Sequence, residues 1–473
     1  MYWNISFLRP PPISAQVGGS ITITPQVAND LRTDLRYEAT DIAYAWQRVY
    51  PTEGRSDRSL AVEHLTTFLP PSSTYRSLSI PLPETAKPGE RWRLGLFPDI
   101  VSESSTSASR AQVALARNLL EYSAEGPSVL SVWSEGIEIT RPQPTVLGPV
   151  RGVGSDPKAN ASANANAKGK KAVKDDGKSK PKGKGKEKDE GPKQGRILRE
   201  WSLDNGGMMR IVEQTSFDLD KKIWDSGLAL SSWLWRHLRG DGASSMHHAT
   251  KHDPLTEKVL RVLRHHQGPL RLLELGASSR GEPQQTGAFM LIASGSGTGL
   301  VSIGLARALR GLTENVHTTI TATDLDSAIG LMAENFALND LAEDAPEAEG
   351  LSPSPSSSSS GDGVAVRARV LDWEQPLPSW VSHEADHAAD VTYNTASFPA
   401  LLGTLSALLD PPALPRRRER PMLLLAYKQR DPGERGLWSM LERKGIKLRQ
   451  VDEVRGAEED GRVEIWVGGR DVI

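Results

Sequence analysis

Short apolar segments alternate with amphipathic segments from Leu270 to the C-terminus, and this alternation limits the folds open to the chain. Apolar runs rich in β-branched residues predict strands at 270–275, 318–324, 364–373, 421–428 and 462–468. Helical spacing of apolar residues predicts helices between them, at 299–311, 327–340, 398–409 and 431–445. Strands that alternate with helices form a mostly parallel sheet covered on both faces. We therefore expect an α/β architecture for this part of the chain.

Two polar segments separate the structured parts. Between Lys158 and Lys193, 12 lysines stand against 5 acidic residues and no aromatic residue is present, so 154–196 is predicted to be a disordered linker. The same lysines also fit a second interpretation, a nuclear-import or polyanion-binding tract. A Pro/Ser-rich stretch at 343–363 is predicted to be a surface loop inserted between structured elements.

Residues 1–153 form a separate N-terminal accessory region in this interpretation. Alternating apolar and polar residues at 20–27 and 129–140 are typical of half-buried strands, and 107–126 has the pattern of an amphipathic helix. These patterns predict a small α+β or β-rich region. We find no catalytic constellation within it.

Composition excludes several classes of protein. The 473-residue chain contains no cysteine, which rules out disulfides, thiolate zinc sites and cysteine nucleophiles and suits a reducing compartment. A formal net charge of −2 argues against a dedicated nucleic-acid-binding protein. We find neither a secretory signal pattern nor an apolar stretch of the roughly 20 residues that span a bilayer. We expect a cytoplasmic protein, with the nucleus as a second location, that does not act at a membrane.

A glycine-rich loop follows the first predicted strand of the α/β part, but it is split. Its halves are "ELG" at Glu274–Gly276 and "SGTGL" at Ser296–Leu300, with Ala277–Gly295 between them. In an open parallel sheet the ligand lies at the carboxyl ends of the strands, beside the first strand–helix turn. Glycines there allow a ligand to approach the backbone closely. The loop is therefore the candidate ligand site.

Three features favour S-adenosylmethionine (SAM) over a nicotinamide dinucleotide as the ligand. The loop does not read G-x-G-x-x-G, and its first strand ends in Glu274, which would repel a pyrophosphate but suits the cationic groups of SAM. Asp324 ends the next strand, about 25 residues after the loop, where a carboxylate accepts hydrogen bonds from both ribose hydroxyls. The alternative role for Asp324 is to cap the helix that follows it.

Several motifs occur in order after the linker, and together they resemble one family. The motifs are "KIWDSGLALSSWL" (222–234), "LELG…SGTGLVSIGLA", "ATDLD…ENFALN", "VLDW" (370–373), "AADVTYNTASFPALLGTL" (388–405) and "LLLAYKQRDPGERGLW". Their combination resembles the seven-β-strand protein-lysine methyltransferases, which modify translation elongation factors, chaperones and AAA-type ATPases. The resemblance covers about 197–472 and implies a Rossmann-like, seven-stranded methyltransferase domain, which we place at 197–473. It also implies SAM as the cofactor and a lysine ε-amine of a protein substrate as the methyl acceptor.

The resemblance also implies roles for particular residues. Trp224 is expected at the edge of the SAM pocket, although packing of an amphipathic helix would also explain it. Trp373 is expected beside the adenine ring, the alternative being a core position at a strand end. Asp390 and Tyr393 are expected to face the incoming lysine and to act in catalysis. The other expected cofactor contacts are Glu274, Gly276, Gly297, Gly299, Asp324 and Ala389.

Two departures from the family pattern affect this site. Ala277–Gly295 enlarges a tight loop, which keeps its contacts only if the excess bulges outward and the ends meet. We interpret these residues as foreign to the family, such as a translated intron. The stretch "HEADH" before Ala388 supplies few apolar residues, so the fourth strand is predicted to be short or damaged.

These departures leave rival interpretations open. The chain could be a catalytically inactive, methyltransferase-like binding module, or a methyltransferase that acts on nucleic acid or on a small molecule. The main interpretation is a monomeric, SAM-dependent protein-lysine methyltransferase. Its ten histidines show no carboxylate–histidine set at ligand spacing, so we expect no metal.

Overall fold

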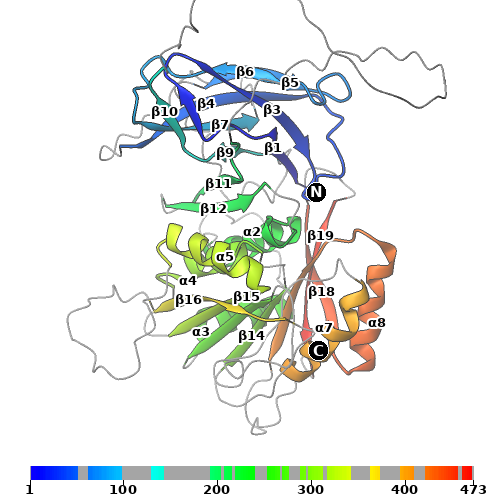
Figure 1. Cartoon of the computed structure of the whole chain (residues 1–473). Coiled ribbons are helices and arrows are strands. Elements are labelled where there is room, and N and C mark those ends of the chain that lie inside the picture. The colour runs from blue at the N-terminus through cyan, green and yellow to red at the C-terminus, as the bar shows by residue number, and fades with distance from the viewer. Residues whose placement is uncertain are drawn as a thin grey trace, which may run out of the picture.

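The structure, a computed structural model, describes residues 2–51, 62–98, 129–142, 192–203, 207–215, 219–239, 253–266, 269–275, 288–293, 297–312, 317–341, 363–372, 395–409, 421–455 and 461–470. Two β-sheets lie at one end of the molecule, and a third sheet covered by helices lies at the other (Figure 1). The predicted helix at 107–126, and nearly all of the predicted linker and of the loop at 343–363, lie outside the described residues. None of the described helices is long and apolar enough to cross a membrane.

The N-terminal region consists of two sheets that pack against each other over one apolar core. The first sheet has the order β6-β3-β1-β8, with β6 at Leu78–Pro81, β3 at Ser20–Ala28, β1 at Trp3–Arg9 and β8 at Val129–Leu130. The second has the order β12-β11-β9-β7-β10-β2, and β4 and β5 extend it from β7. Its strands are β2 (Ser14–Gln16), β4 (Thr40–Tyr50), β5 (Glu63–Phe68), β7 (Arg91–Pro98), β9 (Val132–Ser134), β10 (Ile137–Thr140), β11 (Arg196–Ser202) and β12 (Met208–Gln214). The strands predicted at 20–27 and within 129–140 are therefore present.

A hairpin from beyond the linker completes the second sheet. β11 pairs with β9 on one side and with β12 on the other. The outer edge of β12 is covered by helix α5 (Asp326–Leu338), because the side chains of Asn335 and Asn339 hydrogen-bond the backbone of Val212 and Arg210. The N-terminal sheet is thereby joined to the α/β part, although the sequence divides the two at about residue 197.

The third sheet has seven strands in the order β16-β15-β13-β14-β17-β19-β18. Its first five strands are parallel, whereas β19 runs antiparallel to both β17 and β18. The carboxyl ends of the parallel strands therefore meet at one edge, and the expected Rossmann-like α/β fold is confirmed. The strands are β13 (Leu270–Leu275), β14 (Ala288–Ala293), β15 (Thr318–Asp324), β16 (Val364–Val370), β17 (Met422–Tyr427), β18 (Lys447–Val454) and β19 (Val463–Gly469).

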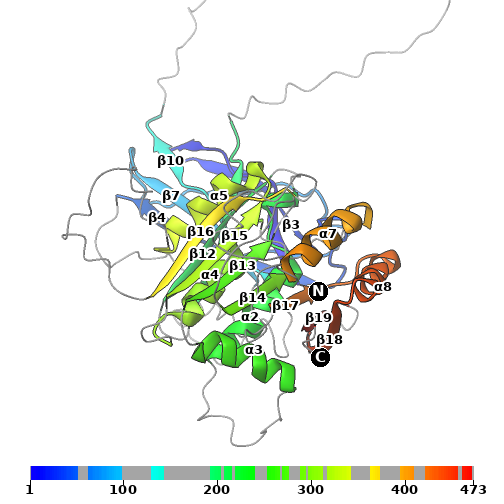
Figure 2. The ribbon, with the colours of Figure 1, turned by 90° about the horizontal axis from the view of Figure 1, so that it is seen from below.

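Helices cover both faces of this sheet. On the face toward the N-terminal region lie α2 (Asp225–Arg239), α3 (Pro254–His265), α4 (Leu300–Leu309) and α5, which share a core with the apolar side chains of β12. On the other face lie α7 (Phe398–Leu409) and α8 (Gly436–Arg443), side by side in Figure 2. Neighbouring residues of β13 point to opposite cores, since Leu272 packs with the first set and Leu273 with the second. Three single turns complete the described helices, η2 (Leu219–Lys221), η3 (Thr395–Ser397) and η4 (Pro432–Arg435).

The strand in the middle of the sheet departs from expectation. β14 belongs to the inserted stretch Ala277–Gly295, yet it pairs in parallel with β13 on one side and with β17 on the other. These six residues therefore do not bulge outward, which was one of the two outcomes that the sequence left open for the insertion. The physical reason is their composition, because the apolar run "AFMLIA" suits a strand that is covered on both faces. The fourth strand expected at about Ala388 lies outside the described residues.

Candidate active site

The second half of the glycine-rich loop forms a tight turn at the start of α4. Gly297 and Gly299 have φ angles of +37° and +77°, a backbone conformation that other residues rarely adopt. A Cβ atom at Gly297 would lie 3.0 Å from the carbonyl oxygens of both Asp220 and Lys222. A Cβ atom at Gly299 would lie 2.7 Å from the ring of Phe336. The close packing around the turn, and not only a ligand, therefore requires both glycines.

Asn335 holds the middle of this turn, a role that the sequence did not reveal. Its side-chain amide donates to the carbonyl oxygen of Thr298 at 2.9 Å, while its carbonyl oxygen accepts the Val212 N–H at 2.8 Å. Asn335 and Thr298 are both almost fully buried. The "ENFALN" motif contains Asn335, but only the fold shows that one side chain links the turn to the edge of β12. Asn335 is therefore a positioning residue for the loop.

Asp324 is the last residue of β15 and is 4% exposed. Its Oδ2 atom accepts the N–H of Gly297 at 2.9 Å, and its Oδ1 atom accepts the N–H of Leu325 at 2.7 Å. Helix α5 begins at Asp326 with Leu325 in the cap position, so Asp324 does not cap that helix. The carboxylate instead fastens the glycine turn to the end of β15, where the sequence predicts the ribose of SAM.

Glu274 lies near the end of the adjacent strand β13 and is almost fully buried. Its Oε2 atom accepts the N–H of Ser302 in the first turn of α4 at 2.8 Å. Its backbone carbonyl accepts the Thr323 hydroxyl at 3.0 Å, which ties the ends of β13 and β15 together. A carboxylate at a helix N-terminus is also favoured by the helix dipole. Glu274 thus holds the start of α4 at the carboxyl edge of the sheet.

The segment before α2 runs along the same turn. The carbonyl groups of Asp220 and Lys222 face Gly297, and Trp224 follows two residues later. The Trp224 side chain is 8% exposed, and the guanidinium of Arg430 lies 4.8 Å from its ring centroid. A guanidinium at this distance over an indole makes a favourable cation–π contact. Glu274, Gly297, Gly299 and Asp324 are therefore brought together, with Trp224 on the segment that borders them.

A buried cluster of charges beyond Trp224 was not predicted. The Lys428 ammonium, just after β17, lies 2.5 Å from Asp225 Oδ2 and 3.8 Å from Asp30 Oδ1. Arg430 pairs with Asp30 Oδ2 at 3.0 Å, and the Asp225 N–H donates to the same oxygen at 3.2 Å. Asp30 comes from the N-terminal region, so this cluster fixes that region at the carboxyl edge of the α/β sheet. Its partners lie 195 to 400 residues apart along the chain, so no local sequence signal could have revealed it.

The two aspartates of this cluster respond differently to their surroundings. Burial raises the pKa of the Asp225 carboxyl, and the negative charge of Asp30 adds to the rise against the attraction of Lys428. Burial also acts to raise the pKa of Asp30, but Arg430 and Lys428 outweigh it and hold that pKa below its usual value. The cluster therefore carries its negative charge most firmly on Asp30.

Several predicted site residues lie outside the described part of the chain. They are Gly276, which follows β13, and Trp373, Ala389, Asp390 and Tyr393, which follow β16. The last two described residues before Trp373 are Leu371, whose N–H donates to the Asp324 carbonyl at 3.0 Å, and Asp372. The chain thus passes the end of β15 immediately before Trp373. The roles of these five residues remain predictions.

The described part of the site suits SAM in its chemistry. Asp324 and Glu274 place carboxylates at the ends of neighbouring parallel strands, beside the glycine turn. Carboxylates accept hydrogen bonds from hydroxyl and ammonium groups but repel phosphates. Asp324 would hold the ribose, and Trp224 lies on the segment that borders the glycine turn. Among the described side chains there is no group of three or more potential metal ligands.

A substitution at Gly299 tests the role of packing in this turn. We expect Gly299→Ala to lower the free energy of unfolding by about 2–4 kcal/mol, because it adds left-handed backbone strain to a clash with buried side chains. Urea unfolding measures the change. Gly330→Ala is the matched control, since nothing lies within 4 Å of its Cβ position inside α5. Equal stability of the two variants would contradict the packing argument.

Comparison with known proteins is consistent with this geometry. A family model described as lysine methyltransferase matches residues 204–352 and 357–444. No curated protein matches the chain. Among solved structures, Aeropyrum pernix fibrillarin in complex with SAM is 10% identical, with a TM-score of 0.26, covering 58% of this chain and 94% of its own. M. jannaschii TYW2 in complex with AdoMet is 12% identical, with a TM-score of 0.26, covering 59% of this chain and 86% of its own.

The family assignment depends on the family model and not on those remote structures. The matched residues make up half of the chain. They include β13, the glycine turn, β15 with Asp324, η4 and α8. The chain therefore belongs to the lysine methyltransferase family and is a SAM-dependent methyltransferase.

Proposed function

We propose that the chain transfers a methyl group from SAM to the ε-amine of a lysine in a protein substrate. The observation that carries the proposal is the lysine methyltransferase match over residues 204–352 and 357–444, which contain the glycine turn and Asp324. Elongation factors, chaperones and AAA-type ATPases are the substrate classes that the motif resemblance favours. The reaction takes place in the cytoplasm in this proposal, with the nucleus as a second location.

The main task of the protein in this reaction is to orient the lysine amine relative to the methyl group of SAM. When bound, SAM supplies an activated methyl group on a sulfonium, which is its own leaving group. The neutral lysine nitrogen attacks the methyl carbon in line, the carbon–sulfur bond breaks, and the methylated ammonium then releases a proton to solvent. Free lysine titrates near 10.4, so the enzyme must favour the neutral amine. Partial desolvation beside a cation lowers the lysine pKa and so favours that form.

An assay in cell lysate tests the substrate class. Lysate is incubated with the purified chain and methyl-labelled SAM, and portions are then treated with protease or with nuclease. We expect protease to release the label, nuclease to leave it in place, and amino-acid analysis to find it in methyllysine. Label that survives protease and is released by nuclease would instead assign the chain to nucleic-acid methylation.

The predicted ribose contact is tested at Asp324. We expect Asp324→Ala to weaken SAM binding by at least about tenfold, because each hydrogen bond to a charged acceptor contributes roughly 1.5–3 kcal/mol. Loss of the Gly297 contact adds to this effect by loosening the turn. Isothermal titration calorimetry measures the affinity. Asp326→Ala, an exposed carboxylate two residues away, is the control and should leave the affinity unchanged. A folded Asp324→Ala variant with wild-type affinity would remove Asp324 from the cofactor site.

A further inference from the structure

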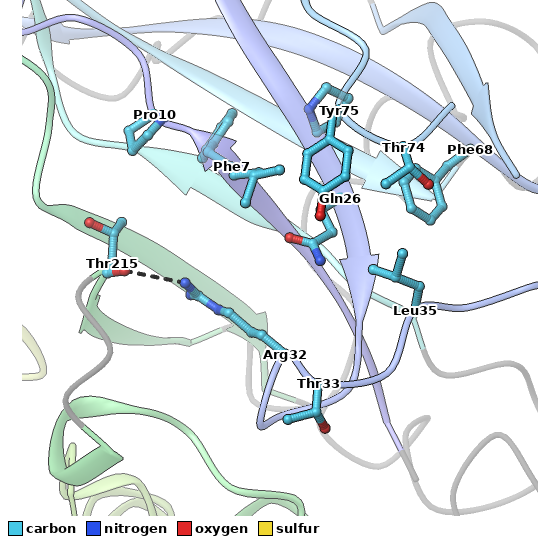
Figure 3. A pocket seen from close by; sticks show the side chains of 12 residues that line it. Phe7, Pro10, Gln26, Arg32, Thr33, Leu35, Phe68, Thr74, Tyr75 and Thr215 are labelled. Atoms are coloured by element: carbon cyan, nitrogen blue, oxygen red, sulfur yellow. Dashed lines mark hydrogen bonds between the residues drawn. The ribbon is translucent and has the colours of Figure 1, made fainter. Parts of the chain in front are cut away.

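The N-terminal region contains a cavity of about 470 Å³ that has no part in the site described above (Figure 3). Seven of its twelve lining residues are apolar or aromatic, and they include Phe7, Phe68 and Tyr75. Arg32 is the one cation among the lining residues. Phe7 and Phe68 are buried in the wall, whereas Tyr75 is 76% exposed and lies at the rim. The cavity is therefore open to solvent and combines an apolar wall with one positive charge.

Within the described residues, few groups balance the charge of Arg32. Its guanidinium makes one hydrogen bond in the described structure, from Nη1 to the carbonyl oxygen of Thr215 at 3.3 Å, drawn as a dashed line in Figure 3. Among the described carboxylates, none lies within the 4.0 Å of an ion pair with it. The negative charge of Glu213 attracts the guanidinium from a greater distance, but that carboxylate already forms an ion pair with Arg199 at 2.5 Å. A guanidinium carries five N–H donors, so most of the donors of Arg32 are open to an external acceptor.

The backbone around the cavity is held in an unusual conformation at two places. Arg32 and Tyr75 have φ angles of +60° and +62°, and they are two of only three described non-glycine residues with positive φ. Such strain gathers at functional sites, where the surrounding structure maintains it. Thr74, the neighbour of Tyr75 in the lining, has a buried hydroxyl without a hydrogen-bond partner in the described structure. The lining thus combines an unsatisfied hydroxyl with a guanidinium that makes one hydrogen bond, and both groups suit a polar ligand.

We propose that this cavity binds a short peptide segment in which a carboxylate stands next to a large apolar side chain. One cation among seven apolar residues matches a single negative charge on an apolar body. A nucleic acid presents a row of phosphates, which is normally matched by several cations. The carboxylate would form a bidentate pair with Arg32, and the apolar side chain would lie against Phe7, Phe68 and Tyr75. The carboxylate can belong to an acidic side chain or to a chain terminus, and the experiment separates these sources.

The cavity also adjoins the segment that leads to the cofactor site. Thr215 directly follows β12, and Asp220 and Lys222 a few residues later place their carbonyl groups against Gly297. Resting on the proposed function, the cavity is then a docking site for the protein substrate, away from the lysine that receives the methyl group. A bound segment would hold the substrate beside the carboxyl edge of the sheet.

Fluorescence anisotropy with the full chain tests the binding directly, without SAM. The probes are the labelled peptide Gly-Ser-Glu-Phe-Gly-Ser with an amidated end, its Gln-for-Glu counterpart, and Gly-Ser-Gly-Phe with a free carboxyl end. We expect the Glu peptide or the free-end peptide to bind with a dissociation constant below about 1 mM, and the Gln peptide at least about tenfold more weakly. Whichever charged peptide binds better identifies the source of the carboxylate. Equal binding of all three peptides, or binding of none, would overturn the proposal.

Variants then locate the binding. Arg32→Gln and Tyr75→Ala should each weaken the preferred peptide at least about tenfold. The matched control Arg76→Gln, which removes an exposed charge next to Tyr75, should not. Tyr75 is largely exposed, so we expect Tyr75→Ala to fold. It therefore still tests the cavity if Arg32→Gln does not fold. Unchanged affinity in Tyr75→Ala, or displacement of the peptide by a short uridine oligonucleotide, would overturn the proposal.

A separate competition experiment tests whether the cavity takes part in methylation. In the lysate assay, an excess of the peptide should reduce labelling by the wild-type chain and have little effect on labelling by Tyr75→Ala. If no label is transferred at all, the proposed function fails while the anisotropy result still decides the peptide site. If label is transferred and the bound peptide does not compete, the site is not a substrate docking site.

Discussion

A chain that lacks residues 277–295 should bind SAM at least about tenfold more tightly than the full chain and methylate lysate proteins faster. The deletion joins "ELG" directly to "SGTGL", the uninterrupted loop that the sequence interpretation predicts. The two halves are already anchored to one place, because Glu274 accepts from Ser302 at 2.8 Å and Gly297 donates to Asp324 at 2.9 Å. The deletion therefore shortens the connection without moving its ends. Calorimetry with SAM and the labelling assay measure the result.

The deletion also removes β14, which makes its folding a sharp test. β14 is hydrogen-bonded to β13 and to β17, so its loss leaves two facing strand edges without partners. Unpaired backbone groups in a buried sheet are costly, so the variant folds only if β13 and β17 pair directly or another strand enters between them. The predicted fourth strand, which is expected to end at about Ala388–Asp390, is the candidate. Two segments of one chain would then compete for the same position in the sheet.

The control is a deletion of 351–360 in the Pro/Ser-rich stretch, which should change neither stability nor SAM affinity. Thermal unfolding monitors both deletions. An unfolded 277–295 deletion would show that β14 is an essential strand of this chain. A folded deletion with unchanged SAM affinity would show that the insertion does not impair the loop. Either result would contradict the interpretation of these residues as foreign to the family.

The parallel sheet could be predicted because its signal is local. The run "TTITATD" of β15 and the helix after it differ in the spacing of their apolar residues. The type of each element can therefore be predicted from its own residues, without knowing which elements it packs against. The carboxyl ends of parallel strands all lie at the ligand-binding edge of the sheet. Asp324, at the end of such a strand, could therefore be placed at this edge from the sequence. Its hydrogen bonds could not, because they depend on where Gly297 returns after the insertion.

The position of β14 could not be predicted, since strand order is a long-range property. "AFMLIA" is recognisable as an apolar run, but nothing within it indicates that it lies between β13 and β17. The motif "ENFALN" presented the same difficulty. Asn335 belongs to that motif, but its hydrogen bonds to Thr298 and Val212 span 37 and 123 residues. Contacts between side chains and segments far apart in the sequence can be recognised only in the folded structure.

Asp390→Asn should abolish methylation, with a loss of activity on the order of 100-fold or more, and should leave SAM affinity nearly unchanged. Asp390 stands in "AADVTY", where the family resemblance predicts that the substrate amine enters. A carboxylate there would bind the lysine as a cation and hold its nitrogen near the methyl group. Asparagine keeps the shape but not the charge, and a misplacement of about 1 Å is enough to cost 100-fold in rate. The labelling assay and calorimetry measure the two quantities on one preparation.

The alternative for Asp390 is a structural role, capping the turn before the helix that contains Phe398. Asparagine caps a helix about as well as aspartate, so a purely structural Asp390 predicts an active Asp390→Asn variant. Asp390→Ala separates the roles further, because it removes the cap as well as the charge and should lower the melting temperature only if the cap exists. Asp326→Asn, at the exposed start of α5, is the matched control for loss of one aspartate charge. If Asp390→Asn methylates at the wild-type rate, the lysine-positioning acid must be sought elsewhere at this edge. Asp225 would then be the next residue to change, because its carboxylate is already buried beside Trp224 and Lys428.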